Sequence, residues 1–118
     1  MTNPIWREGA ATTAARIAAG DLSASDAVGS ALDRIAEVNG PLNAIVDDQA
    51  DTARAAAEAL DKEFKANGPV GPLHGLPVTI KVNVDQAGSA TTNGIPALKD
   101  AMAKEDAPLV ANLKRAGA

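Results

Sequence analysis

The apolar positions of the first 20 residues follow a helical spacing. Residues 1–8 read as a lead-in whose anchor is Trp6, the only tryptophan of the chain. Residues 9–19 carry Ile17 and a set of alanines that can share one helix face, and Gly20 is a natural stop. The pattern predicts a short first helix behind an anchored segment.

A second helix is predicted from Ser23 to about Val38. Its apolar face is made of Ala27, Val28, Ala31, Leu32 and Ile35. Ser23 is placed to cap the first turn, and Asp26, three residues later, is placed to reach back to it. The sequence Asn39-Gly40-Pro41 is expected to end this helix.

A third helix is predicted after a brief strand at residues 44–46. Asp47 or Asp48 can cap it, and its apolar stripe alternates spacings of three and four, at Ala50, Ala53, Ala57, Leu60 and Phe64. Residues 67–69, Asn-Gly-Pro, are expected to close it. The first 67 residues therefore read as the helical part of the chain.

The composition changes at residue 68. Residues 68–77 contain three prolines and three glycines, so no regular element is expected there. Residues 78–82, Val-Thr-Ile-Lys-Val, then read as a strand covered on both faces, because apolar and polar positions do not alternate cleanly. Residues 86–96 read as a loop, or as a second short strand around residues 90–92.

The last element predicted is a helix that Asp106-Ala107-Pro108 opens, with proline in the first turn. Its buried face is expected to comprise Leu109, Val110, Leu113 and Ala116, and Gly117 to end it. The element order leaves a sheet of two or three strands, which is barely enough for independent stability. The sequence thus reads as one domain cut mid-fold, with a helical part (1–67) and a strand–loop–helix part (68–118).

The composition predicts a thin hydrophobic core and argues against several classes of function. The chain is 46% hydrophobic, but much of that is alanine, with one Trp, one Phe and no Tyr. Its net charge of −4 gives no basic surface for nucleic acid or anionic lipid. It has no cysteine, no apolar signal core and no apolar run long enough to span a bilayer, so a soluble cytoplasmic protein without a thiolate metal site is expected.

Lys81 is the sharpest candidate for chemistry. A lysine at the end of an apolar strand can be desolvated, and desolvation lowers a lysine pKa until the amine accepts a proton. The alternative is a charged residue that simply ends a strand. The residues alone favour that alternative, because Ser-Lys chemistry needs a serine partner.

None of the four serines, Ser23, Ser25, Ser30 and Ser89, has a lysine three residues later or lies in a Gly-x-Ser-x-Gly turn. His74, the single histidine, lies in a Pro/Gly turn and is more typical of a structural residue than of an acid–base group. It cannot form a metal site alone. Asp85 is expected to pair with Lys81, and the pairs Asp47/Asp48 and Asp61/Glu63 to be helix-cap or solvated charges.

Several segments, taken in order, resemble one known family. They are Gly71-Pro72-Leu73-His74-Gly75-Leu76-Pro77-Val78-Thr79-Ile80-Lys81, then Thr91-Thr92-Asn93-Gly94, then Asp106-Ala107-Pro108-Leu109-Val110 and the sequence from Leu113 to Ala118. Earlier segments, including Leu22-Ser23-Ala24 and Leu42-Asn43-Ala44, agree in position. The chain resembles the N-terminal portion of the amidase signature family over nearly its whole length.

The resemblance implies an α/β fold, in which N-terminal helices and the first strands of a mixed sheet are covered by helices. It also implies hydrolysis of small-molecule carboxylic amides by a nucleophilic serine, a second serine on a cis peptide bond, and a lysine, without a cofactor. Lys81 matches that lysine. Both serines belong to a Gly/Ser-rich segment that this sequence does not contain, so the chain alone is expected to be inactive. One departure is Val82, where many relatives have aspartate.

Two functional hypotheses follow. The chain is either the N-terminal part of an amidase or a binding or scaffold module that retains the family's shape without its chemistry. In either case its unpartnered sheet edge and helix faces are expected to bind the missing C-terminal part or a second copy of the chain.

Overall fold

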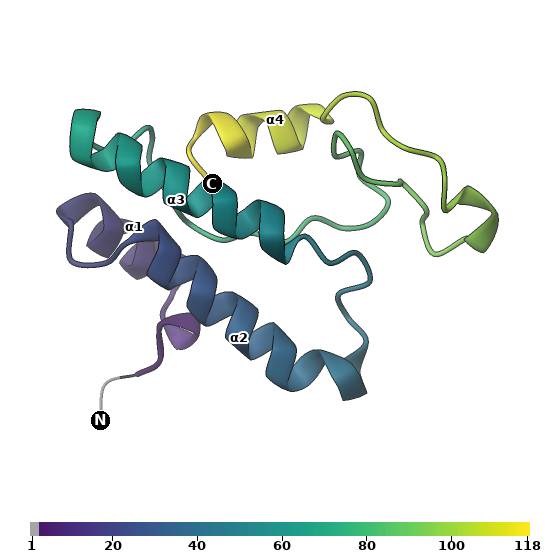
Figure 1. Ribbon diagram of the computed structural model, residues 1–118, viewed down its shortest axis with the longest axis horizontal. Coiled ribbons are helices and arrows are strands. Elements are labelled where there is room, and N and C mark those ends of the chain that lie inside the picture. Colours follow the sequence, from purple (N-terminus) through teal and green to yellow (C-terminus); the bar gives the residue numbers. More distant parts are fainter. Residues whose placement is uncertain (1–2) are drawn as a thin grey trace.

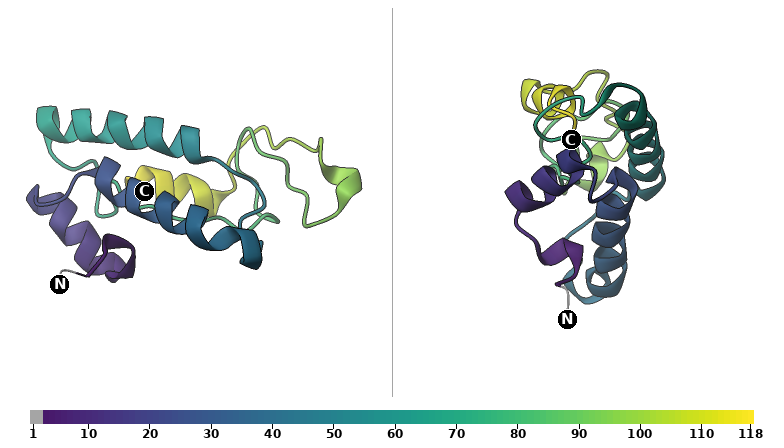
Figure 2. Two further views of the ribbon diagram at one scale, coloured as in Figure 1. Left: turned by 60° about the horizontal axis from the view of Figure 1, so that its bottom comes forward. Right: turned by 90° about the vertical axis from the view of Figure 1, so that its left-hand side faces the viewer.

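The computed structural model describes residues 3–118; the predictions for residues 1 and 2 of the lead-in lie outside the described residues. In this part of the chain, four α-helices and two short 3-10 helices follow one another without a strand. The molecule measures 45 × 32 × 21 Å. Helices α2 (Ala24–Leu42) and α3 (Ala50–Asn67) lie side by side, and α4 (Pro108–Arg115) lies near α3. The part of the loop between α3 and α4 around the 3-10 helix η2 (Pro96–Leu98) projects away from them (Figures 1 and 2).

The first two predicted helices form where their cap residues place them. Helix α1 spans Ala10–Ala19 and ends at Gly20, which has φ +80°. Helix α2 spans Ala24–Leu42, and the side chain of Ser23 accepts a hydrogen bond from the backbone N–H of Asp26. The start of α2 and the end of α1 are thus local signals in the sequence, whereas Gly9 at the start of α1 offers no side-chain cap.

The predicted end of the second helix is wrong, because α2 continues through Pro41 to Leu42. Proline costs little there, since it removes only one bond in the last turn. The Asn39 side chain then secures the end: its Oδ1 accepts from the N–H of Ala44 (2.9 Å) and of Ile45 (2.8 Å), and its Nδ2 donates to the Ile45 carbonyl (2.9 Å). These bonds also hold residues 44–46 as an irregular turn, so the brief strand predicted there is absent.

Helix α3 spans Ala50–Asn67, and Gly68 follows it with φ +80°. The N-cap residue is Gln49 rather than Asp47 or Asp48, but the Asp48 carboxylate, one position earlier, accepts the Ala50 N–H at 2.9 Å. Helix α4 spans Pro108–Arg115 with proline in its first turn. Of its predicted buried face, Val110 is buried and Leu113 and Ala116 are half-buried, but Leu109 is exposed, so that assignment is wrong.

The core is thin and rich in alanine, as the composition predicts. One cluster is formed by Ile17, Leu22 and Ala27, with Ile5 of the 3-10 helix η1 (Ile5–Arg7) packed on it. A second, between α2 and α3, is formed by Ala24, Val28 and Ala57, with Leu32, Ala53 and Leu60 at its edge. Small side chains let the two helices approach closely but bury little area.

Trp6 attaches the N-terminal lead-in to α2 through contacts at the protein surface, not in the core. Its backbone N–H donates to the Ser30 hydroxyl at 3.2 Å. The Arg34 guanidinium carbon lies 4.4 Å from the Trp6 ring centroid, a cation–π distance. The lead-in is thus fixed on α2 by Ile5 inside and Trp6 outside.

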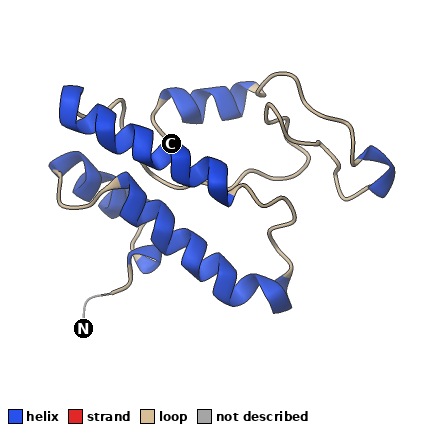
Figure 3. Ribbon diagram, viewed as in Figure 1, coloured by secondary structure: helices blue, strands red, loops and turns tan. Residues whose placement is uncertain are grey.

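The predicted mixed sheet is not found in residues 3–118 (Figure 3). Residues 77–81 are irregular, and no backbone hydrogen bond joins residues 77–80 to another described residue. The second predicted strand is reduced to a single antiparallel bridge between Ala90 and Met102. The physical reason is that β-branched residues favour a strand but a ladder needs a neighbour, and this part of the chain offers none. None of the described helices is long and apolar enough to cross a membrane.

Candidate functional site

The segment before the candidate lysine is a tightly packed turn. Residues 74–76 are buried between the helices. The N–H of Leu73 donates to the Ala116 carbonyl (2.9 Å), and the N–H of Gly75 donates to the Gly117 carbonyl (2.8 Å). Two backbone bonds therefore join this turn to the end of α4, about forty residues later in the chain.

Gly75 and Gly117 permit this contact because they lack a side chain. Gly75 has φ +73°, and a Cβ there would lie 2.6 Å from the Cβ of Ala24, which is fully buried. Gly117 has φ +96°, and a Cβ there would lie 2.8 Å from the His74 Cα. Any larger residue would separate the turn from α2 or from the end of α4.

His74 is one of the most buried side chains, with 2% of its surface exposed. Its Nδ1 accepts the N–H of Val70 at 3.0 Å, and its ring lies against Phe64 of α3, with 5.7 Å between ring centroids. Its Nε2 is buried and has no hydrogen-bond partner among the described residues. This placement agrees with a structural role in the turn.

Lys81 stands at the end of the irregular segment 77–81, and its side chain is exposed. Within residues 3–118 its ammonium group has no hydrogen-bond or ion-pair partner. The expected pairing with Asp85 is wrong: the Asp85 carboxylate accepts the Thr91 hydroxyl instead, at 2.5 Å. The backbone on the far side of the lysine is held, because the Val84 N–H donates to the Lys81 carbonyl at 2.9 Å.

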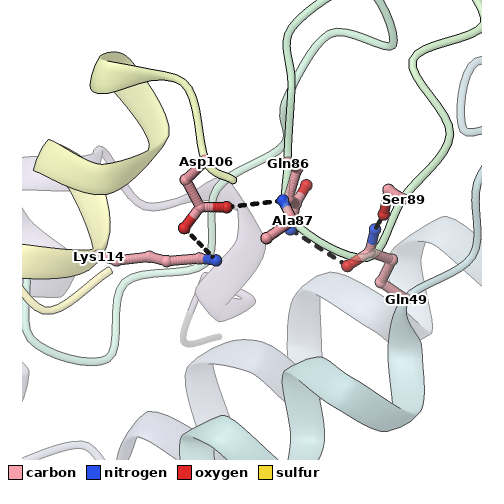
Figure 4. A network of polar contacts seen from close by, with 6 residues as sticks. All are labelled: Gln49, Gln86, Ala87, Ser89, Asp106 and Lys114. Carbon is pink, nitrogen blue, oxygen red and sulfur yellow. Dashed lines mark hydrogen bonds and ion pairs between the residues drawn. The ribbon is translucent and has the colours of Figure 1, made fainter. Parts of the chain in front are cut away.

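The loop after Lys81 is held by Asp106 and Lys114 (Figure 4). The Asp106 carboxylate accepts the Ala87 N–H at 2.8 Å and the Lys114 ammonium at 2.7 Å. The bond from Lys114, with the bond from Ala87, lowers the pKa of Asp106 below its ordinary value. The start of this loop is therefore attached to α4 at neutral pH.

A second contact joins the loop to the first turn of α3. The side-chain amide of Gln49 donates to the Ser89 hydroxyl, and its oxygen accepts from the Gln86 amide at 3.2 Å (Figure 4). No sequence pattern marks Gln49, because its partners lie about 40 residues later. This tether is therefore visible only in the folded structure.

The four serines all take part in structural hydrogen bonds. Ser23 caps α2, Ser30 accepts the Trp6 N–H, and Ser89 accepts from Gln49. Ser25 donates its hydroxyl to Asp61 of α3 at 2.5 Å. None is close in sequence to a second serine on a cis peptide bond, because residues 3–118 contain no cis peptide. The structure thus gives Lys81 no serine partner from this part of the chain.

Asp61 is a structural residue whose role the sequence did not specify. Its carboxylate accepts the N–H of Ala24 (2.7 Å) and of Ser25 (3.1 Å), so a residue of α3 caps the start of α2. Partial burial by itself would raise the pKa of Asp61, but these bonds and the Ser25 hydroxyl lower it on balance. No three His, Asp or Glu side chains of the described residues are placed to share a metal ion.

The decisive comparison is with a family model described as Amidase, which matches residues 26–118. The chain belongs to the amidase family. The resemblance noted in the sequence is therefore confirmed, and the motif that carries Lys81 lies inside the matched region.

Two curated amidase relatives illustrate the similarity. The chain is 50% identical over 115 residues to the indoleacetamide hydrolase of Bradyrhizobium diazoefficiens, a match that covers 98% of this chain and 22% of that enzyme. It is 36% identical to fatty-acid amide hydrolase 2-B of Danio rerio, over 100% of this chain and 24% of that protein. The chain thus spans between a fifth and a quarter of the length of these relatives.

Solved amidase structures agree with the fold. The native peptide amidase of Stenotrophomonas maltophilia superposes with a TM-score of 0.86 at 33% identity, over 97% of this chain and 24% of that one. A fatty acid amide hydrolase superposes with a TM-score of 0.91, over 99% of this chain and 21% of that one; at 24% identity it supports the fold alone. The helices and the projecting loop described here are therefore the arrangement that amidases have in this region.

Proposed function

We propose that this chain is the N-terminal part of an amidase that hydrolyses carboxylic amide C–N bonds, and that Lys81 is its base. The observation that carries the proposal is the placement of Lys81. It follows a turn that is packed on the helices and precedes a loop that is tethered to α3 and α4, yet its ammonium has no partner in residues 3–118. An exposed amine between two anchored segments, without a partner in the described residues, is suited to a partner supplied by another segment.

The mechanism follows the pattern that the resemblance implies. A neutral Lys81 accepts a proton through a bridging serine on a cis peptide bond, while a second serine attacks the amide carbonyl carbon. Collapse of the tetrahedral intermediate expels the amine, which takes up the proton, and water then releases the acid from the acyl-serine. This chain contributes the lysine and its supporting framework, and both serines come from outside it.

Desolvation would give Lys81 the basicity that this mechanism needs. In the isolated chain the Lys81 side chain is exposed to water. When an apolar partner covers the segment 77–81, loss of water lowers a lysine pKa and allows the neutral form at neutral pH. We therefore expect the isolated chain to be inactive, and we propose the cytoplasm as its location.

A chimera tests the proposal directly. Residues 1–118 replace the matching N-terminal stretch of the B. diazoefficiens indoleacetamide hydrolase, and release of ammonia from indoleacetamide is measured. The 50% identity across the exchanged region makes folding of the chimera a fair expectation. Hydrolysis by the chimera, with none by the isolated chain, supports the proposal.

The other candidate, a scaffold module without chemistry, makes the opposite prediction. A chimera that folds and remains monodisperse, yet releases no ammonia above the background of a sample without enzyme, would favour the scaffold. Turnover by the isolated chain that disappears in Lys81→Ala would also contradict the proposal, because it would show that no external serine is needed.

A further inference from the structure

His74 has a defined proton arrangement in this fold. Its Nδ1 lies 3.0 Å from the backbone nitrogen of Val70, and that N–H can only donate. The Nδ1 must therefore offer its lone pair, which in a neutral imidazole places the proton on Nε2. A doubly protonated ring would direct one N–H at another and break this bond.

The same residue is fixed from two sides. Phe64 of α3 packs against the ring at an interplanar angle of 50°, and Gly117 approaches the His74 Cα closely. The neighbours of His74 bond to the Ala116 and Gly117 carbonyls at the end of α4. The imidazole thus lies where the turn, α3 and α4 meet.

The value of histidine at this position lies in Nδ1 rather than in Nε2. The Nε2–H is buried without an acceptor among the described residues, and burial of an unpaired donor is unfavourable. A leucine of similar size would avoid that cost. The bond to Val70 is the polar contact that distinguishes the histidine from such an apolar residue, and the ring contact with Phe64 is the other difference.

The turn controls the direction in which the lysine-bearing segment leaves the helices. Leu76 is the last buried residue before this segment, and no backbone hydrogen bond among residues 3–118 holds residues 77–80. Lys81 lies five residues further, or roughly 16 Å along an extended chain. Because the turn fixes the N-terminal end of this segment, a rotation of the turn would shift the backbone that leads to the lysine, and a misplacement of about 1 Å can cost about 100-fold in rate.

We infer that His74 is a positioning residue: its neutral imidazole, protonated on Nε2 and accepting the Val70 N–H at Nδ1, orients the turn that presents Lys81. The inference rests on the proposed function for its consequence in catalysis. The protonation pattern of the His74 ring does not depend on the proposed function and can be tested on the isolated chain.

The first test measures the protonation pattern by ¹⁵N NMR of the isolated chain. His74 is the only histidine, so its ring signals need no assignment by mutation. A non-protonated Nδ1, with a through-bond coupling to the Val70 amide proton, is expected. A protonated Nδ1 would overturn the inference, whatever the chimera does.

The second test compares His74→Asn with His74→Leu in the chimera. The asparagine Oδ1 can replace Nδ1 as acceptor, whereas leucine fills the space without an acceptor. We expect kcat to fall by about tenfold or more in His74→Leu with little change in KM, and to recover largely in His74→Asn. Equal losses in both variants would overturn the positioning role. An active His74→Leu chimera with unchanged kcat would also overturn it.

The experiments distinguish failure of the proposed amidase function from failure of the His74 inference. An inactive wild-type chimera contradicts the proposed function and removes the catalytic consequence, while the ring protonation is still decided by NMR. If His74→Leu does not fold, the comparison of His74→Asn with wild type decides, because a correct inference requires near-wild-type kcat in that variant.

Discussion

The Asp61 carboxylate on α3 accepts the backbone N–H of Ala24, the first residue of α2, at 2.7 Å. The bond joins α2 and α3 through two residues that are 37 positions apart in sequence, and it supplements the local Ser23 cap at the same helix end. A helix N-terminus also favours a negative charge, so the two effects act in the same direction.

Asp61→Ala should destabilise the chain at neutral pH by about 1 kcal/mol, the usual worth of a helix cap. The pKa of Asp61 is lowered in the folded state, so its contribution is present above the unfolded value near 4 and is lost as the pH falls through the lower folded pKa. The difference between wild type and Asp61→Ala, measured by urea unfolding, should therefore shrink between pH 5 and pH 2.

Glu58→Gln is the matched control, because Glu58 is an exposed acid on the same helix. It should leave the free energy of unfolding unchanged within about 0.5 kcal/mol. A difference between wild type and Asp61→Ala that stays constant with pH would contradict the charged cap.

Gly75→Ala should destabilise the fold by about 2 kcal/mol or more. The residue has φ +73°, which is strained for alanine, and the new Cβ would lie 2.6 Å from that of Ala24. Gly29→Ala provides the control within α2, since a Cβ there meets nothing within 4 Å. It should stabilise the helix by about 0.5–1 kcal/mol.

Thermal unfolding of the two variants checks this pair. A melting temperature lowered in Gly75→Ala and raised in Gly29→Ala is expected. If both variants melt like wild type, the close packing of the turn on α2 is wrong.

The isolated chain should self-associate by pairing the segment 77–80 with that of a second copy. This segment has no backbone partner in the described residues, and Val78 is 44% exposed. Sedimentation should show a dimer that dissociates on dilution. Val78→Lys should shift the equilibrium to monomer, because lysine on an exposed edge discourages pairing. A wild-type chain that is monomeric at high concentration would contradict this prediction.

The sequence was sufficient for features that depend on near neighbours. Gly20, the Ser23 cap and the turn after Asn67 mark helix ends within a few residues, and the structure places them there. The predicted end of α2 is wrong because a proline is tolerated in the last turn of a helix. The Asn39 side chain stabilises this end by hydrogen bonds to the residues that follow.

Features that depend on distant residues could not be predicted. The strand at residues 78–82 requires a neighbouring strand, and the propensity of its residues says nothing of whether one is present. The roles of Asp61, Gln49 and His74 likewise come from contacts between segments. The catalytic role of Lys81 stays a prediction that rests on the family motif in which it lies. Without the motif, the residues favour a surface charge, because no serine stands at a suitable spacing.

The central claim is that Lys81 is the base of an amidase, and kcat of the chimera tests it most directly. Lys81→Ala should lower kcat by orders of magnitude, as loss of a catalytic-triad member does. Lys99→Ala, which removes another exposed lysine outside the turn, should leave kcat unchanged. A Lys81→Ala chimera that folds normally and hydrolyses indoleacetamide at a near-wild-type rate would contradict the account.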